Sequence, residues 1–186
     1  MTKMWDEQMK HPSTKAYYDK LKEIVSKVVI PKEPLPLFPG YEVLEIGLDV
    51  GISARCFLEF PNIRLTSIDP GEVDRGIDEI NEMKAGDKWT YHHMTSDKYF
   101  EVCKKEFDII YIDGDHSDEQ VKKDFNNAWK YIKKGGVIIG HDFLHQQNFL
   151  NNKNCGVTKA VCEFINEQNC EAHIYPPNPG LITIIK

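Results

Sequence analysis

The sequence has no long apolar run. Charged and apolar positions alternate through its first thirty residues, and nowhere in its 186 residues do eighteen apolar residues follow one another. A membrane-spanning helix needs about 20 such residues, and a secretory leader needs an apolar stretch of its own. We therefore expect neither a membrane span nor a leader, and we expect a cytoplasmic protein.

Closely spaced cysteine pairs are also missing. The chain has five cysteines and no C-x-x-C; they are Cys56, Cys103, Cys155, Cys162 and Cys170. An odd number leaves at least one thiol unpaired within a monomer, and zinc ribbons or thioredoxin-like sites need paired spacings. The pattern indicates reduced thiols in a cytosolic protein.

Basic residues are fewer than acidic ones, with 23 Lys and Arg against 29 Asp and Glu, and the formal net charge is −6. The electrostatic field of a chain with this net negative charge repels a polyanion, so nucleic acid is not an expected partner. The hydrophobic content of 41% in 186 residues is enough for one globular domain with its own core.

Predicted strands and helices alternate from residue 41 onward. The strands are expected at 42–47, 64–69, 89–94, 107–112, 136–141, 172–175 and 181–185, and the helices at 51–60, 72–84, 97–105, 118–133 and 157–168. This alternation predicts an α/β fold, a Rossmann-like doubly wound, mostly parallel sheet with helices on both faces.

The first forty residues follow a different pattern. An amphipathic helix is expected after Ser13 and should end before Pro31, and residues 31–40 are rich in proline. We therefore predict an N-terminal helical extension with a Pro-rich connector over 1–40 and a catalytic domain over 41–186.

The helix expected at 118–133 places a group of polar residues. Ser117 and Gln120 have the spacing of a capping box, and Gly135 and Gly136 are expected to end the helix. Residues 113–116 then fall in the turn between a strand's carboxyl end and a helix, which is where open parallel sheets bind ligands.

The stretch YEVLEIGLDVGIS runs from a strand into a turn with Gly47 and Gly51. A diphosphate cradle would require G-x-G-x-x-G, whereas these glycines have the spacing G-x-x-x-G. A cofactor with a ribose and no diphosphate fits better, and S-adenosylmethionine is the common one. Asp69 ends the next strand, where its carboxylate would accept hydrogen bonds from the ribose hydroxyls.

Other polar residues near this turn have two interpretations each. Glu45 lies in an apolar strand and needs a partner, either the amino group of the cofactor or a Lys or Arg side chain. Ser53 either caps the following helix or bonds the cofactor. Ser96 and Asp97 follow the third strand, where they either contact an adenine edge or cap a helix.

A second polar group follows two successive strands, FDIIYIDGDH and GVIIGHDF. Carboxylates can ligate a hard divalent ion, and a histidine can act as a general base near neutral pH. The alternative is that these are loop aspartates and histidines with local hydrogen bonds only. The members are Asp113, Asp115, His116, His141 and Asp142.

The segments EIGLDVGIS, SID, YIDGDHSDEQ, KKGGVIIGHDF and GLITIIK together resemble the class I S-adenosylmethionine-dependent methyltransferases, in the small branch with D-G-D-H-S after the fourth strand. The resemblance implies seven strands with the last antiparallel beside the fifth. It implies that a divalent metal would be held by Asp113, His141 and Asp142. The cofactor-binding residues that it implies are Glu45, Gly47, Gly51, Ser53, Asp69, Ser96, Asp97 and Asp113.

The expected activity is in-line methyl transfer to the oxygen of a small hydroxylated acceptor, with a sugar as one candidate. Either His116 or His141 would be the base, or a divalent metal such as Mg²⁺ near Asp113 would activate the acceptor. Two alternatives remain, an NAD(P)-dependent oxidoreductase and a non-catalytic nucleoside-binding protein.

Overall fold

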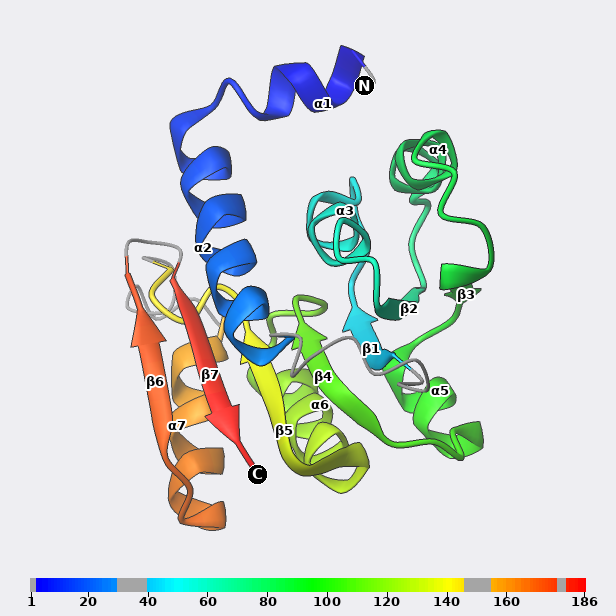
Figure 1. Ribbon diagram of the computed structural model, residues 1–186. Helices are drawn as coiled ribbons and strands as arrows, with labels where there is room; N and C mark the ends of the chain where they lie inside the picture. The colour runs from blue at the N-terminus through cyan, green and yellow to red at the C-terminus, as the bar shows by residue number, and fades with distance from the viewer. Residues whose placement is uncertain (1–2, 30–39, 146–154, 177–179) are drawn as a thin grey trace.

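A seven-stranded β-sheet forms the centre of the molecule (Figure 1). The computed structural model describes residues 3–29, 40–145, 155–176 and 180–186. The strands lie in the order β3-β2-β1-β4-β5-β7-β6. They are β1 (Tyr41–Ile46), β2 (Ile63–Asp69), β3 (Trp89–His93), β4 (Phe107–Ile112), β5 (Ile132–Gly140), β6 (Ala172–Tyr175) and β7 (Leu181–Ile185).

Neighbouring strands are parallel except at β7, which is antiparallel to both β5 and β6 and points the opposite way in Figure 1. The expected doubly wound sheet, with its last strand antiparallel beside the fifth, is confirmed. None of the helices in the described ranges is long and apolar enough to cross a membrane.

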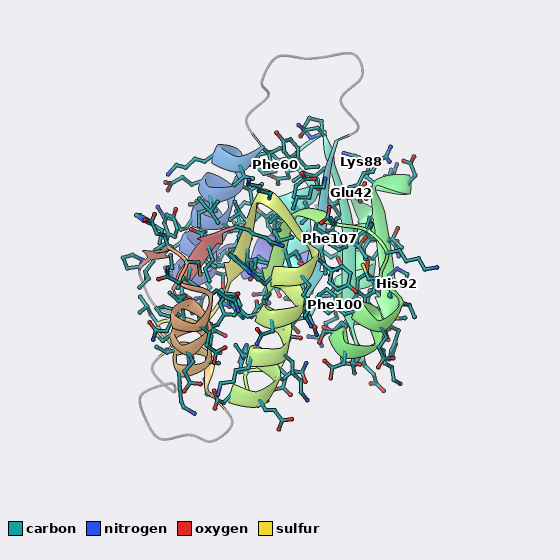
Figure 2. All side chains as sticks on the ribbon, turned by 90° about the horizontal axis from the view of Figure 1, so that it is seen from below. Glu42, Phe60, Lys88, His92, Phe100 and Phe107 are labelled. Atoms are coloured by element: carbon teal, nitrogen blue, oxygen red, sulfur yellow. The ribbon has the colours of Figure 1, made fainter. Side chains whose placement is uncertain are left out.

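Helices cover both faces of this sheet. They are α1 (Lys3–Gln8), α2 (Pro12–Val28), α3 (Ile52–Leu58), α4 (Asp74–Glu82), the short 3-10 helix η1 (Gly86–Lys88), α5 (Ser96–Val102), α6 (Asp118–Tyr131) and α7 (Val157–Gln168). Buried residues of α2, α3 and α4 share one hydrophobic cluster, and those of α5, α6 and α7 share the other. Phe100 and Phe107, labelled in Figure 2, belong to the second cluster.

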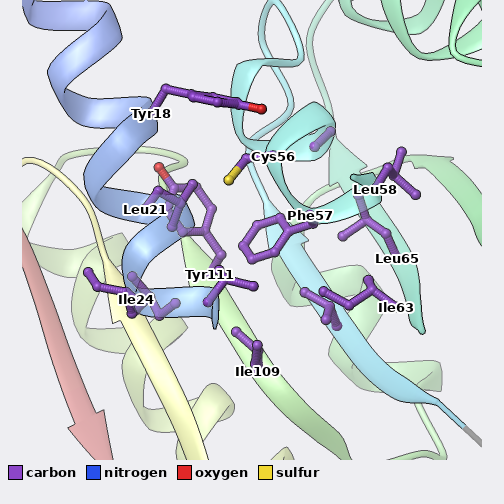
Figure 3. Close-up of a cluster of buried hydrophobic side chains, with 14 of the residues drawn as sticks. Tyr18, Leu21, Ile24, Cys56, Phe57, Leu58, Ile63, Leu65, Ile109 and Tyr111 are labelled. Atoms are coloured by element: carbon purple, nitrogen blue, oxygen red, sulfur yellow. The ribbon is translucent and has the colours of Figure 1, made fainter. Parts of the chain in front are cut away.

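Strand β4 shows why helices must cover both faces of the sheet. Its apolar run FDIIYI is typical of a parallel strand that is buried on both sides. Successive side chains of a strand point to opposite faces, so Ile109 and Tyr111 join the first cluster while Ile110 and Ile112 join the second. Figure 3 shows Ile109 and Tyr111 facing α2 and α3.

The N-terminal helix α2 packs directly on the domain. Its residues Leu21, Ile24 and Val25 are buried, and Leu21 lies near Phe57 and Tyr111 in Figure 3. The helix is the one that the sequence predicts, and Pro at its first turn suits a helix start. The connector at 30–39 lies outside the described residues, so the boundary at residue 40 stays a prediction.

The expected end of the helix at 118–133, which is α6, is wrong. Helix α6 ends at Tyr131, and Gly135 and Gly136 lie within β5, which already begins at Ile132. The pairing of β4 with β5 shifts its register between Phe107 and Ile109, and Gly135 adopts φ +80°. The two glycines therefore belong to an irregular part of β5 and do not mark the end of α6.

The capping box is only half formed. The hydroxyl of Ser117 accepts a hydrogen bond from the Gln120 amide N–H. The Gln120 side chain turns away to Ser96, Asp97 and Asp124, and the Ser117 amide donates to Asp115 instead.

Candidate functional site

Three hydrogen bonds continue the sheet one residue beyond its strand ends. Gly47 donates its amide N–H to Ile68, Asp113 donates to Ile46, and His141 donates to Ile112. Each bond extends the pairing of parallel neighbours. Gly47, Asp113 and His141 therefore stand in one row at the carboxyl edge of the sheet, where ligands bind in folds of this kind.

The glycine turn is tightly packed against this row. Gly47 has φ +94°, and a Cβ built there would lie 2.1 Å from the carbonyl oxygen of Asp113. Gly51 has φ +80° and forms the left-handed residue before α3. At position 47 a Cβ would both disfavour the positive φ and clash with the backbone of Asp113, so only glycine fits. The turn passes directly beside the end of β4.

Asp69 holds the turn from the side of β2. Its Oδ2 accepts hydrogen bonds from the amides of Leu48, at 2.9 Å, and Asp49, at 3.3 Å, while Oδ1 accepts from Gly71 at 2.7 Å. The carboxylate also lines a cavity together with Gly47. The expected ribose contact stays a prediction, and the structure adds a role in fixing the turn.

Glu45 lies beneath the turn and is fully buried. Its Oε1 accepts a hydrogen bond from Ser53 and its Oε2 accepts one from Ser67, each at 2.5 Å. Serine hydroxyls thus take the place of the cationic partner that the sequence left open. Burial raises the pKa of Glu45 to about 8, against the two serine hydrogen bonds that lower it.

Four of the five strand-end candidates meet at one point. The Nδ1 atom of His141 lies 3.0 Å from Asp113 Oδ1 and 3.4 Å from Asp142 Oδ1. The Nε2 atom of His116 lies 3.2 Å from Asp142 Oδ2 and 3.5 Å from Asp113 Oδ1. Asp115, the fifth, instead accepts the amide hydrogen of Ser117 at 2.7 Å.

The charges of this cluster depend on one another. Burial alone would lower the pKa of His141, yet Asp113 and Asp142 raise it to about 10. Asp113, whose carboxylate accepts from the His116 ring, raises the pKa of His116, and burial partly offsets this effect. Burial opposes the ionisation of Asp113, but the two histidines outweigh it and hold its pKa well below the usual range. The cluster therefore sets two imidazole rings against two carboxyl groups in direct contact.

Asp142 has an unusual backbone. Its φ of +55° is in the left-handed region, which residues other than glycine adopt at a cost. Asp and Asn tolerate this conformation best. The sharp bend after β5 keeps the carboxylate next to His116 and His141, and such bends are common where function requires a fixed geometry.

The cluster also has the donor set of a metal site. Asp113, His141 and Asp142 each offer one ligand atom, and these three atoms lie within 4.8 Å of one another. Two carboxylate oxygens and one imidazole nitrogen fit a divalent ion, and imidazole suits Mn²⁺ or Zn²⁺ better than Mg²⁺.

Ser96 and Asp97 bond two residues of α6: Gln120, which the sequence analysis placed in a capping box, and Asp124, which it missed. The Ser96 hydroxyl donates to Asp124 Oδ1 at 2.6 Å, and Gln120 Nε2 donates to Asp97 at 3.3 Å and to Asp124 at 3.1 Å. Burial raises the pKa of Asp124 to about 6. The sequence pattern of the helix expected at 118–133 gave no sign of this polar network.

Two cavities meet at the carboxyl edge. The larger has a volume of about 690 Å³ and runs from Asp69 past Ser96 and Asp97 to His116 and Asp142. The smaller, of about 230 Å³, lies between the glycine turn and the first half of α2. Both are lined by Gly47, Asp49, Asp113 and His141. The row of strand-end residues is therefore the floor that the two cavities share.

The smaller cavity contains the second feature that the sequence analysis missed. Tyr17 of α2 lines it, and its hydroxyl lies 2.6 Å from the hydroxyl of Tyr111. Tyr111 in turn donates to Asp113 Oδ2 at 3.0 Å. The sequence predicted an amphipathic helix here but no role for Tyr17 in the site, because its partner Tyr111 is 94 residues away.

Comparison with known proteins gives a consistent result. A family model described as a methyltransferase domain matches residues 44–143, which are 100 of the 186 residues. A curated but uncharacterized protein of Acanthamoeba polyphaga mimivirus is 50% identical over 36 residues. That match covers 19% of this chain and 16% of the viral protein.

Solved structures show the same fold. A candidate caffeoyl-CoA O-methyltransferase from Staphylococcus aureus has a TM-score of 0.74 at 20% identity, over 92% of this chain and 83% of that one. An O-methyltransferase from Bacillus cereus in complex with SAH (S-adenosylhomocysteine) has a TM-score of 0.71 at 19% identity, over 95% and 82%. An SAH-bound methyltransferase from Podospora anserina has a TM-score of 0.71 at 13% identity, over 97% and 85%.

Proposed function

The chain belongs to the family of methyltransferase domains, and on this basis we propose that it transfers the methyl group of S-adenosylmethionine to a hydroxyl oxygen of a small acceptor. One observation carries the proposal beyond the family. Gly47, Asp113 and His141 form the shared floor of two cavities, so a nucleoside crevice opens directly onto a cluster of ionisable groups. The structures of similar fold that hold SAH support the choice of cofactor.

The larger cavity suits the nucleoside. Asp69 stands at its β2 end and would accept hydrogen bonds from the ribose hydroxyls, while Ser96 and Asp97 would face the adenine. Ser53 lines the smaller cavity, and Glu45 orients it from below. Gly47 and Gly51 shape the turn between the cavities. The D-G-D-H-S branch and these residue roles stay proposals.

When bound, S-adenosylmethionine supplies an electrophilic methyl group on sulfur. The protein must then hold the acceptor oxygen in line with the sulfur–carbon bond and receive its proton. We assign the base role to His116 rather than His141 because both histidines line the larger cavity, but His116 is 38% exposed and His141 only 13%. His141 is held between Asp113 and Asp142 and would orient their carboxylates.

A divalent ion at Asp113, His141 and Asp142 is the second part of the proposal. It would lower the pKa of the acceptor hydroxyl. Its positive charge would also offset the negative charge of the Asp113 and Asp142 carboxylates. With less negative charge beside it, His116 would give up a proton more readily and would be available as a base.

A panel of small hydroxylated acceptors, sugars included, tests the proposal through release of S-adenosylhomocysteine. Release with at least one acceptor is the expected result. Cofactor binding without release across the panel would favour the non-catalytic nucleoside-binding alternative. Calorimetric titration with S-adenosylmethionine and with NAD(P) separates the proposal from the oxidoreductase alternative, which the family match already disfavours.

A further inference from the structure

Tyr17 brings the N-terminal helix α2 into contact with the reaction end of the site. Its hydroxyl oxygen lies 2.6 Å from that of Tyr111, and its ring centroid lies 4.6 Å from that of His141. Tyr17 also lines the smaller cavity beside Asp113 and His141. The side chain of Tyr17 thus contacts His141 directly and contacts Asp113 through Tyr111.

The direction of the hydrogen bonds follows from the number of hydrogens available. Tyr111 is completely buried, and its single hydroxyl hydrogen is donated to Asp113 Oδ2. The Tyr111 oxygen must therefore accept the hydrogen of Tyr17. The result is an ordered chain in which Tyr17 donates to Tyr111 and Tyr111 donates to Asp113, while the other oxygen of Asp113 faces His141.

We propose that Tyr17 is a positioning residue for methyl transfer, which orients Asp113 through Tyr111 and fixes the ring of His141 by packing against it. This inference rests on the proposed function of the same site. A chain of hydroxyl groups restricts the rotation of the carboxylate, because each bond in it has a single donor and is part-buried. The N-terminal helix is then part of the reaction site and not only of the core.

The adjacent residue gives a matched control. Tyr18 is buried, and its ring packs edge-on against Trp5, with the two ring centroids 5.1 Å apart. It lies near Leu21 and Cys56 in Figure 3 and lines neither of the two cavities described above. Replacing either tyrosine with phenylalanine removes one hydroxyl group from the same helix, but only the change at position 17 reaches the site.

The kinetic test compares these two variants. Tyr17→Phe should lower kcat about three- to tenfold, the effect of one lost hydrogen bond, and should change the dissociation constant of S-adenosylhomocysteine less than about twofold. Tyr18→Phe should leave kcat unchanged. In a Tyr111→Phe background, Tyr17→Phe should cause no further loss, because Tyr17 acts through Tyr111. Wild-type kcat in Tyr17→Phe, or an additive loss in the double variant, would overturn the inference.

A measurement without turnover separates this inference from the proposed function. The imidazole 15N resonances of His141 in the unligated protein should shift in Tyr17→Phe and stay in place in Tyr18→Phe. Unshifted resonances in both variants would overturn the positioning role, even if the wild-type protein transfers methyl groups. If no acceptor supports methyl transfer, the proposed function fails, and the resonances still decide the role of Tyr17.

Discussion

Gly47 and Asp113 approach so closely that a Cβ at position 47 would lie 2.1 Å from the carbonyl oxygen of residue 113. The turn after β1 and the end of β4 are thus packed directly against each other. Real Cβ atoms do not come that near a backbone oxygen, so any side chain here must push apart the floor that both cavities share.

Gly47→Ala should therefore destabilise the protein well beyond the cost of its backbone conformation. Gly135→Ala is the matched control, since Gly135 has φ +80° and nothing within 4 Å of its missing Cβ. The control should lose about 1 to 2 kcal/mol from left-handed strain, and Gly47→Ala several kcal/mol. Urea unfolding measures both losses. Equal losses in the two variants would mean that the turn does not press on β4.

The histidine–carboxylate cluster should matter more for turnover than for cofactor binding. Replacing any member singly is expected to lower kcat about tenfold or more while the affinity for S-adenosylhomocysteine changes little. The variants are Asp113→Asn, His116→Gln, His141→Gln and Asp142→Asn. Asn at position 142 preserves the left-handed backbone, so it removes only the charge.

Asp118→Asn is a suitable control for that series. Asp118 pairs with Lys159 at 2.6 Å and lines neither of the two cavities described above. Its kcat should equal that of the wild type. Wild-type turnover in all four cluster variants would reject the assignment of this cluster to the reaction.

The fold was more predictable from the sequence than the site. The strand FDIIYI and the turn EIGLDVGIS carry short-range patterns, so their place in the sheet follows from a few adjacent residues. Tyr17 and Asp124 carry no such pattern. Tyr17 acts through Tyr111, and Asp124 through Ser96 on another helix, so only the folded chain brings these partners together.

Glu45 shows the same limit. Its burial was predictable from the apolar strand around it, but its partners Ser53 and Ser67 became visible only once α3 and β2 were placed. The prediction of where α6 ends was wrong for a local reason. Gly135 and Gly136 suggest a helix end as much as a bulged strand, and the pairing with β4 decides between the two.

Glu45 should make stability depend on pH. Burial raises its pKa in the folded protein to about 8, from the ordinary value of 4.5 for a glutamate, so the folded state favours the protonated form. Its contribution is therefore fully present below about pH 4.5 and is lost as the pH rises through about 8. Glu45→Gln keeps the shape without the titration. The thermal midpoint of this variant should fall less between pH 5 and pH 8 than that of the wild type.

Parallel pH profiles for the two proteins would contradict this assignment. They would mean that Glu45 stays ionised in the folded protein and that the two serine hydroxyls compensate for its burial.

A metal requirement predicts a reversible loss of activity. Dialysis against a chelator should abolish methyl transfer, and Mn²⁺ or Zn²⁺ should restore it at lower concentrations than Mg²⁺, because one of the three ligands is an imidazole. His141→Asp should shift this preference toward Mg²⁺. Activity that persists unchanged after chelation would leave proton transfer to His116 alone.

The central claim is that the crevice beside Gly47 and Asp69 binds the nucleoside of S-adenosylmethionine. Calorimetric titration with S-adenosylhomocysteine tests it directly, in the wild-type protein and in Asp69→Ala. We predict one binding site in the wild type and an affinity lower by about one to two orders of magnitude in the variant, since charged hydrogen bonds to the ribose are lost. No binding to the wild-type protein, or equal affinity in both proteins, would contradict the account.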